Sequence, residues 1–431
     1  MNGGSLSSSL AGFTILEIGE QPGDYAALLL AGLGAEVIKI EPRDGAESRR
    51  IGPFVSASRD SEEGLFFWRY NLNKKSVALD VDQPEARHVL AALASNADIV
   101  LLAGEYETVA RRIPLWRELA EKNPRLIVCA ITPFGLDGPH CALKTTDLVQ
   151  MALGGIMAVC GYDPDQDLAY DTPPIAPAMW HSFHLGGEYA AVAIMAAINF
   201  RELSGEGQFI DVSVHEAVNT CTEIAIPTYI YSGQVVMRQT ARHAATIITH
   251  ARLTKSADGV FMLASLSPFE REQRALAQLA DQMGIAHVLG TPEFVQLEKD
   301  DGGAAALYRN DILVQIIEGL SADDLFSRAQ ALGLAWSPIR RPEENLEDPH
   351  FSARGSFATI NHLELGRTVR YPGTVAIAED GHTPHFSYTR RAPRLGEHTD
   401  EILKRAGLSD ADRAALARKK VIGSPAGISA E

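Results

Sequence analysis

The sequence predicts an α/β protein whose larger domain has a doubly wound parallel sheet. Short apolar segments of strand length alternate with helical segments through the first 131 residues, which is the pattern of strand–helix–strand units. Residues 186–203 are mostly small and aliphatic, with no charged side chain between Glu188 and Arg201. That composition is typical of a helix that is buried on several sides.

The first strand–helix–strand unit covers residues 14–41. Its predicted strands are 14–18 and 34–41, joined by a small-residue helix at 25–33, and this spacing favours parallel pairing. Pro114 is predicted to separate two helices, because proline removes a backbone donor and clashes with the preceding turn. The same alternation predicts strands at 76–79, 98–102, 126–131 and 208–214, and helices at 84–94, 107–112, 115–122 and 186–203.

From residue 225 onward the pattern indicates a smaller α+β domain. Ser267 and Pro268 suit the first turn of a helix that ends near Met283, and Asp258 with Gly259 suits a turn between short strands. Further helices are predicted at 310–319, 322–332, 399–406 and 410–418.

These patterns divide the chain into parts. We expect a large domain at 1–224, a small domain at 225–334, and an extended connection at 335–384, which is rich in proline, glycine and charge. Residues 1–9 are rich in glycine and serine and have neither a basic start nor an apolar run, so a disordered tail is predicted, not a signal peptide.

Composition excludes several functional classes. A net charge of −16 argues against nucleic acid as a partner. No segment approaches the roughly 18 consecutive apolar residues of a membrane span, so no membrane association is expected. The cysteines show no CxxC pair and no zinc-type spacing with histidine, so reduced thiols in a cytoplasmic protein and no bound metal are predicted. The four cysteines are Cys129, Cys141, Cys160 and Cys221.

The turn after the first predicted strand, residues 19–23, contains two glycines but no GxGxxG pattern. That pattern lets a backbone approach the pyrophosphate of a dinucleotide. Neither NAD nor a flavin is therefore predicted.

Six stretches of the chain, in this order, carry a family resemblance: residues 10–17, 33–41, 71–80, 134–157, 201–213 and 392–399. They resemble the class III CoA-transferases, the family of formyl-CoA transferase and carnitine CoA-transferase, and the resemblance covers almost the whole chain. It implies a Rossmann-like large domain completed by residues 385–431, an interlocked dimer in which each subunit threads through the other, and a CoA thioester as substrate.

The resemblance also identifies a missing group. In the family, an aspartate four residues before a helix-opening glycine attacks the thioester carbonyl and forms a mixed anhydride. Gly187 is that glycine here, so Phe183 stands in the place of the aspartate, and a phenyl ring cannot form an anhydride. His181 and His184 are the nearest candidates for acyl acceptor or general base. The alternative is that both histidines are merely hydrogen-bonded at the start of a helix.

Around the expected CoA site the resemblance implies contacts from Gln21, Lys74 and Lys75, although a solvated lysine pair is the alternative for the last two. Two segments depart from the family. The usual Asn-Phe-x-Pro-Gly is replaced by a segment that contains Glu105, and the usual Ala-Gly-Pro turn ends here in Asp24. Both changes place a carboxylate where a phosphorylated ligand is expected, which is unfavourable for the ligand.

These departures lead to three functional hypotheses. The first is a non-nucleophilic subunit that pairs with a homologous subunit carrying the aspartate. The pair would form a heterodimer or heterotetramer, and without such a partner the chain would form a homodimer. The start of the buried helix is similar to that of the E subunit of benzylsuccinate CoA-transferase. The second is an independent acyl-CoA racemase or isomerase in which His181 or His184 moves the proton α to the thioester. The third is a complete transferase with Asp171 or Glu188 as nucleophile.

Overall fold

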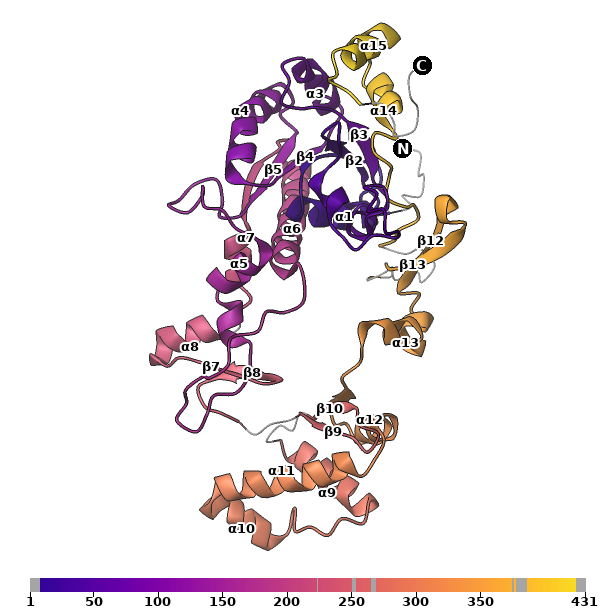
Figure 1. Ribbon diagram of the computed structural model, residues 1–431. Coiled ribbons are helices and arrows are strands. Elements are labelled where there is room, and N and C mark those ends of the chain that lie inside the picture. Colours follow the sequence, from indigo (N-terminus) through magenta and orange to yellow (C-terminus); the bar gives the residue numbers. More distant parts are fainter. Residues whose placement is uncertain are drawn as a thin grey trace. The chain divides into compact units, whose positions relative to one another are not determined.

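The computed structural model describes residues 8–222, 224–249, 253–264, 269–373, 376 and 386–423 (Figure 1). The chain forms two compact units. The first consists of residues 1–156, 177–221 and 348–431, and the second of 157–176 and 222–347. The boundaries differ from the expected ones, because residues 157–176 belong to the second unit and the segment after 348 belongs to the first.

The first unit is built on a six-stranded sheet in which every neighbouring pair is parallel. The strand order is β3-β2-β1-β4-β5-β6. Strands β2 and β3 are added on one side of β1 and strands β4 to β6 on the other, so the strand order reverses between β1 and β4. This confirms the predicted α/β fold with a doubly wound parallel sheet. The strands are β1 (Thr14–Gly19), β2 (Glu36–Glu41), β3 (Lys75–Ala78), β4 (Ile99–Ala103), β5 (Ile127–Thr132) and β6 (Phe209–Ser213).

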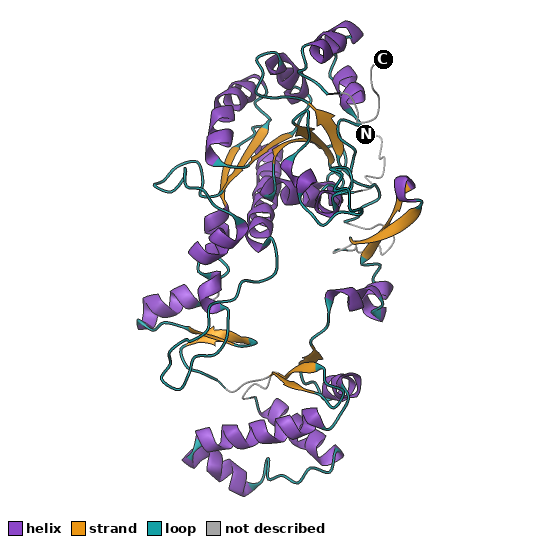
Figure 2. Ribbon diagram, in the orientation of Figure 1, coloured by secondary structure: helices purple, strands orange, loops and turns teal. Residues whose placement is uncertain are grey.

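Helices cover both faces of this sheet, as Figure 2 shows. Because both faces are covered, the central strands are nearly continuous apolar runs, and all five residues of β4 are buried. The helices of this unit are α1 (Pro22–Gly32), α2 (Leu65–Tyr70), α3 (Ala86–Ala94), α4 (Tyr106–Lys122), α5 (Asp147–Leu153), α6 (His181–Ser204), α7 (Val214–Asn219), α13 (Pro349–Ala353), α14 (Thr399–Arg405) and α15 (Asp410–Arg418), with 3-10 turns η1 (Glu47–Arg50) and η4 (Leu363–Leu365).

The predicted break at Pro114 is wrong, because α4 continues through this residue as one helix. A single apolar stripe along α4 is buried in the core that it shares with α3, α14 and α15. Burial of this stripe on both sides of the proline outweighs the loss of one backbone hydrogen bond. The stripe consists of Val109, Ile113, Trp116 and Leu119.

The C-terminal segment covers the outer edge of β3. Backbone hydrogen bonds join His398 to Ser76 and Asp80 to Val421, and Leu79 forms a bridge with Ile422. An edge strand with unpaired backbone groups is a template for unwanted pairing. The C-terminal segment therefore pairs with the edge of a sheet whose strands come from the first half of the chain.

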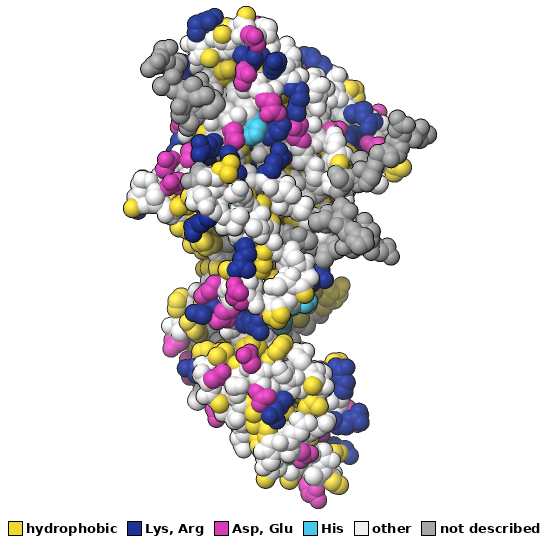
Figure 3. Space-filling view, turned by 90° about the vertical axis from the view of Figure 1, so that its right-hand side faces the viewer, with side chains coloured by type: hydrophobic (Ala, Val, Ile, Leu, Met, Phe, Trp, Pro, Cys, Tyr) yellow, Lys and Arg dark blue, Asp and Glu magenta, His cyan; other side chains and the backbone are white. Residues whose placement is uncertain are grey.

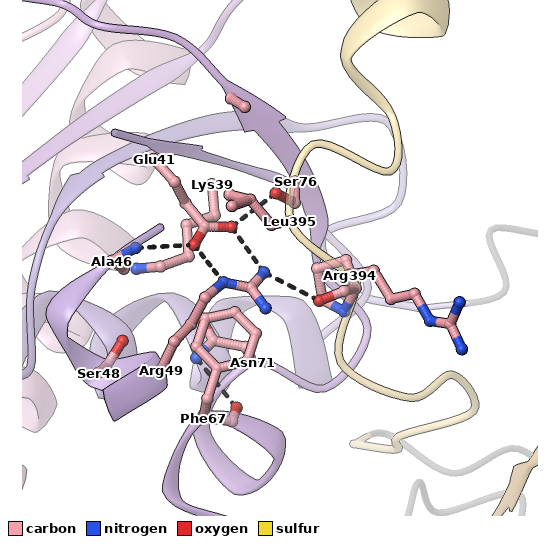
Figure 4. Close-up of polar contacts among 12 residues, drawn as sticks. Lys39, Glu41, Ala46, Ser48, Arg49, Phe67, Asn71, Ser76, Arg394 and Leu395 are labelled. Carbon is pink, nitrogen blue, oxygen red and sulfur yellow. Dashed lines mark hydrogen bonds and ion pairs between the residues drawn. The ribbon is translucent and has the colours of Figure 1, made fainter. Parts of the chain in front are cut away.

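A buried arginine joins the loop after β2 to this C-terminal segment (Figure 4). The Arg49 guanidinium donates to both oxygens of Glu41, at 2.6 and 2.9 Å, and to the Pro393 carbonyl at 3.0 Å. Ser76 donates to the same carboxylate at 2.6 Å. Glu41 is thus fully paired, which a buried carboxylate requires.

The expectation of an extended connection at 335–384 is wrong for its middle part. Strands β12 (Phe357–His362) and β13 (Arg367–Pro372) form an antiparallel hairpin there. Its turn uses Gly366 at a φ of 60°, a left-handed conformation that glycine adopts without strain. Ile360 and Tyr371 of this hairpin pack in one cluster with Leu28 of α1. Burial of these side chains explains why the segment folds.

The second unit is α+β, as predicted, with a three-stranded antiparallel sheet in the order β11-β10-β9 against four helices. A β7–β8 hairpin and α8 precede that sheet. The elements are η2 (Ile156–Val159, which begins at the boundary), α8 (Ala225–Ser232), β7 (Met237–Gln239), β8 (Arg242–Ala245), β9 (Leu253–Lys255), β10 (Phe261–Ala264), α9 (Glu270–Gln282), α10 (Pro292–Asp300), α11 (Gly302–Glu318), α12 (Ala322–Ala331), β11 (Trp336–Pro338) and η3 (Pro342–Leu346).

One helix start in this unit differs from the predictions, and another cannot be compared. Ser267 and Pro268, predicted to open α9, lie outside the described residues. Helix α11 begins at Gly302 instead of residue 310, because the Asp301 side chain accepts a hydrogen bond from the Ala304 backbone and caps the helix there. Within the described part of the chain, every helix is too short or too polar to span a lipid bilayer.

Candidate active site

The carboxyl ends of β1 and β4 lie side by side where the strand order reverses, the usual ligand position in doubly wound folds. Here the first βα turn is packed directly against the end of β4. A Cβ on Gly19, whose φ is 139°, would lie 1.9 Å from the Ala103 carbonyl oxygen, and one on Gly23 would lie 2.6 Å from the Ala103 Cβ. Only glycine fits at these two positions, and the turn leaves little space beside β4.

Two glycines bring α6 equally close to its neighbours. A Cβ on Gly187 would lie 3.0 Å from the Pro22 carbonyl of α1, and one on Gly186 would lie 2.8 Å from a Val214 methyl group of α7. The close approach of α6 to α1 places the first turn of α6 beside Tyr25.

The predicted helix is present as α6, but it begins at His181 instead of residue 186. It is not buried on several sides in this chain, because Tyr189, Val192 and Phe200 are exposed. Its close approach to α1 positions the candidate site.

An aspartate from α5 holds the first turn of α6 in place. Both the backbone N–H and the hydroxyl of Ser182 donate to Oδ1 of Asp147, at 2.9 and 2.7 Å. Trp180, in a left-handed conformation, precedes the helix, and its carbonyl accepts the N–H of His184. Residue 183 is thereby fixed between two anchored neighbours.

The residue at this fixed position, Phe183, has an apolar environment. Its ring stacks on Trp180 with centroids 5.7 Å apart and planes at 20°. Trp180 in turn meets Phe66 of α2 edge to face at 5.0 Å. The ring therefore extends an aromatic cluster at the place where the resemblance implies a carboxylate.

His184 is held by two tyrosines. Its Nε2 is 2.6 Å from the Tyr70 hydroxyl, and its ring lies over Tyr25 with centroids 4.2 Å apart. Burial, with a smaller contribution from His181, lowers the pKa of His184 to about 4, so the imidazole is neutral at pH 7. Among the described residues, no carboxylate forms a hydrogen bond with His184, so an orienting group of the kind that a catalytic base needs is missing.

Of the other proposed nucleophiles and bases, only His181 lies near Phe183, in the same helical turn. His181 is exposed, with its ring centroid 6.4 Å from that of His184. Glu188 lies further along α6 and accepts a hydrogen bond from the Tyr25 hydroxyl at 3.4 Å. Asp171 belongs to the second unit. The structure thus brings His181 and His184 near Phe183, without a partner that would activate either one.

Lys74, one of the predicted CoA contacts, lies in a buried charged quartet that we define as Glu17, Asp24, Lys39 and Lys74. All four side chains are fully buried. Lys39 Nζ lies 2.8 Å from Glu17 and 2.5 Å from Asp24, while Lys74 Nζ lies 2.7 Å from Glu17 and 2.9 Å from the Asp24 carbonyl. The Lys74 ammonium group therefore faces carboxylates of its own chain.

The pKa values of the quartet follow from burial and pairing. Burial opposes the charge of Asp24, but Lys39 and Lys74 outweigh it and lower the pKa of Asp24 to about 2. Burial raises the pKa of Glu17 to about 7 against the attraction of the two lysines. Burial also opposes the charge of Lys39, but the carboxylates raise its pKa above the usual range. Asp24 and Lys39 are therefore charged at neutral pH.

The sequence analysis missed this quartet because each charged residue was considered alone. Glu17 and Lys39 occupy paired positions of neighbouring strands in otherwise apolar runs. Opposite charges at matching positions of two buried strands are a usable signal, because a buried charge requires a partner. Lys74 and Asp24 gave no comparable signal, since neither lies within a strand.

The two remaining predicted CoA contacts lie nearer the surface. Lys75 forms ion pairs with Glu36 at 3.0 Å and Glu401 at 2.7 Å. On the face that Figure 3 shows, acidic and basic side chains are similarly interspersed. Gln21 is half-buried at the N-cap of α1, and its side chain makes no capping hydrogen bond.

Two further carboxylates lie on loops at the carboxyl end of the sheet. Glu20 accepts the backbone N–H groups of Glu47 at 3.0 Å and Ser48 at 3.3 Å, and burial raises the pKa of Glu20 to about 7. Glu105 follows β4, is exposed, and pairs with Lys144 at 2.6 Å. Of the two carboxylates that the sequence analysis singled out, Glu105 is thus exposed and Asp24 is buried in the quartet.

Residues 10–399 match the family model of CoA-transferase family III. The chain belongs to this family. The family resemblance inferred from the six stretches is thereby confirmed. The chain is 28% identical over 404 residues to succinyl-CoA:(R)-benzylsuccinate CoA-transferase subunit BbsE of Thauera aromatica, covering 92% of this chain and 93% of that protein.

One further relative and one solved structure resemble the chain. The chain is 26% identical to the succinyl-CoA–L-malate CoA-transferase beta subunit of Chloroflexus aurantiacus, covering 98% of this chain and all of that protein. The crystal structure of a CAIB/BAIF family protein from Brucella suis matches the fold with a TM-score of 0.75 at 24% identity, over 93% of this chain and 99% of that one.

Proposed function

We propose that this chain is the non-nucleophilic subunit of a heteromeric CoA-transferase of family III. The complete enzyme would move CoA between an acyl-CoA, such as succinyl-CoA, and a carboxylic acid. The supporting observation is Phe183, which follows the anchored Ser182 and stands, by the count from Gly187, where the resemblance implies the acyl-carrying aspartate. The partner is a homologous chain that retains this aspartate, interlocked with the present one.

The chemistry explains why Phe183 decides the proposal. In family III, a carboxylate oxygen attacks the thioester carbonyl, the carbon–sulfur bond breaks, and CoA leaves as the thiolate while a mixed anhydride forms. A phenyl ring has no lone pair with which to form the new carbon–oxygen bond. Its ring is stacked on Trp180 instead.

Neither histidine compensates for the missing aspartate. The Nε2 atom of His184 is engaged with Tyr70, and protonation of the ring is unfavourable because its pKa is lowered to about 4. His181 is exposed near the helix start, where water competes for its nitrogens. These observations weigh against the racemase hypothesis and against a histidine-dependent transferase.

Two of the relatives described above are named as subunits, which supports a heteromer with a homologous partner. A subunit that has the family fold but lacks the nucleophile can still contribute to function if it completes the active site of its partner. The hydrogen bond from Ser182 to Asp147 and the close packing at Gly186 and Gly187 hold α6 in place, which supports this structural role.

The test compares the chain alone with the chain co-expressed with a homologue that retains the aspartate. Acyl transfer from succinyl-CoA to a panel of mono- and dicarboxylic acids is measured by chromatography of the CoA esters. We expect no transfer by the chain alone and transfer by the pair. Activity of the pair should be lost when the partner's aspartate is changed to alanine.

The matched variants on this chain are His184→Gln and His181→Ala. We expect the pair to keep transfer within about threefold of the unmodified pair in both, because neither side chain takes part in bond formation. Transfer by the chain alone would refute the proposal. Loss of transfer in a pair that contains a folded His184→Gln variant would favour a histidine mechanism instead.

A further inference from the structure

The first βα turn of this chain contains carboxylates where doubly wound folds commonly hold phosphate. Such folds use positive potential at the carboxyl end of β1, supplied by basic side chains and backbone N–H groups. Two such sources are present here. One is the ammonium pair of Lys39 and Lys74, and the other is the pair of backbone N–H groups of Glu47 and Ser48.

Asp24 neutralises the first source. Its Oδ1 lies 2.5 Å from Lys39 Nζ and 3.8 Å from Lys74 Nζ, and its carbonyl accepts a hydrogen bond from Lys74 at 2.9 Å. With Glu17 included, the quartet contains two carboxylates and two ammonium groups, none of them exposed. Both lysine side chains are thus engaged with carboxyl groups of their own chain and are not available to an external anion.

Glu20 binds the second source of positive potential, the pair of backbone N–H groups. Its two carboxylate oxygens accept the N–H groups of Glu47 and Ser48, at 3.0 and 3.3 Å, at the start of η1. Glu20 lies four residues before Asp24 in the same βα turn, so one short segment fills both positions. The tight contact of Gly19 with Ala103 further reduces the space at the end of β1.

We propose that Asp24 and Glu20 take the place of a phosphorylated ligand and close this chain's own switch point to CoA. The CoA of the heteromeric enzyme is then held by the partner subunit alone. The inference deepens the proposed function and rests on it for the existence of that partner. It also accounts for Lys74, whose sequence context resembles a CoA contact while its ammonium group is fully buried.

Equilibrium dialysis with CoA tests the proposal directly. We expect no bound CoA on the isolated full-length chain and one CoA per pair of chains in the heteromer. Binding of one CoA per isolated chain, or of two per pair, would contradict the proposal that the switch point of this chain is closed to CoA. A chain that binds CoA without transferring acyl groups refutes the closure alone, whereas acyl transfer by the isolated chain refutes the proposed function.

A second experiment opens the site. In the double variant Glu20→Gln, Asp24→Asn, both carboxylates become neutral amides of similar size. We expect inorganic pyrophosphate to raise the melting temperature of this variant by several degrees, because a ligand that binds only the folded state stabilises it. The same pyrophosphate concentration should leave the unmodified chain unchanged.

The matched control is Asp44→Asn, which removes an exposed carboxylate paired with Arg50 in the neighbouring loop. This exchange lowers the negative charge of the chain, but Asp24 still pairs with the two lysines and Glu20 still accepts the backbone N–H groups. Pyrophosphate should therefore not stabilise the Asp44→Asn variant. If the double variant does not fold, the half-buried Glu20→Gln alone serves for the same measurement. Equal stabilisation of the unmodified chain, or none in a folded Glu20 variant, would contradict the proposal.

Discussion

Replacing Lys39 by methionine should destabilise the first unit strongly. Methionine has nearly the same length and keeps the packing, but it removes the ammonium group that pairs with Glu17 at 2.8 Å and Asp24 at 2.5 Å. The variant leaves two buried carboxylates with only Lys74 as a counter-charge. The perturbation is therefore electrostatic and confined to the quartet.

The magnitude follows from the burial of the quartet. Removing one partner of a buried ion pair costs about 3–5 kcal/mol, because the remaining charge cannot be solvated. Two charges 4 Å apart interact by about 4 kcal/mol at an effective dielectric constant of 20, which is of the same size. We therefore expect Lys39→Met to lower the free energy of unfolding by about 4 kcal/mol, a large share of the roughly 5–15 kcal/mol of an ordinary domain.

The assay is urea denaturation followed by tryptophan fluorescence in a Trp336→Phe background. The remaining tryptophans, Trp68, Trp116 and Trp180, all lie in the first unit, so the signal reports that unit. Adding Asp24→Leu to Lys39→Met leaves one neutral pair between Glu17 and Lys74. The double variant should recover about 2 kcal/mol relative to additive losses.

The control is Lys75→Met, the same exchange at the residue next to Lys74. Lys75 is paired with Glu36 and Glu401 at the surface, so its loss should cost at most about 1 kcal/mol. The reasoning is refuted if Lys39→Met costs no more than this control. It is also refuted if the Lys39 and Asp24 changes are strictly additive.

Four further measurements test the candidate site. The ring protons of His184 should titrate by NMR near pH 4, and a midpoint near the ordinary 6.5 would contradict its burial against the tyrosines. Asp147→Ala should lower the free energy of unfolding by about 2 kcal/mol, because Ser182 loses an acceptor for two donors; Asp147→Asn should lose less in the same denaturation curves. Gly19→Ala should leave little soluble protein at 37 °C, since its Cβ would lie 1.9 Å from a carbonyl oxygen. Phe183→Asp alone should yield no acyl adduct with succinyl-CoA by intact-protein mass spectrometry, and an adduct would show that the chain binds CoA itself.

The parallel sheet could be predicted because its strands are apolar runs, and burial on both faces leaves a strong pattern. The elements that could not be predicted depend on distant contacts. Pro114 lies inside a helix because the residues around it share a buried stripe, which a local rule for proline does not include. The hairpin of β12 and β13 packs on Leu28, more than 300 residues away in the chain.

The candidate site likewise contains some features that could be predicted from the sequence and others that could not. The identity of Phe183 follows from the sequence by counting from Gly187, but its place inside the first turn of α6 was not predicted, because the helix was expected to begin at residue 186. The state of Lys74 could not be predicted, because a lysine in a polar segment is ordinarily solvated and only the fold shows that Glu17 and Asp24 surround it. Partners that meet across a sheet from separate segments leave no local pattern at the lysine itself.

The C-terminal cover on β3 has a consequence for synthesis of the protein. Arg49 bonds to Pro393, 344 residues later, and the outer edge of the sheet is capped by residues near 398 and 422. Until the ribosome releases the last part of the chain, β3 has an open edge and Glu41 is only partly enclosed. An open strand edge is a template for intermolecular pairing, so we expect nascent chains to be more prone to aggregation at this stage. A deletion of the last thirty or so residues should therefore lower the soluble yield even though it removes no part of the candidate site.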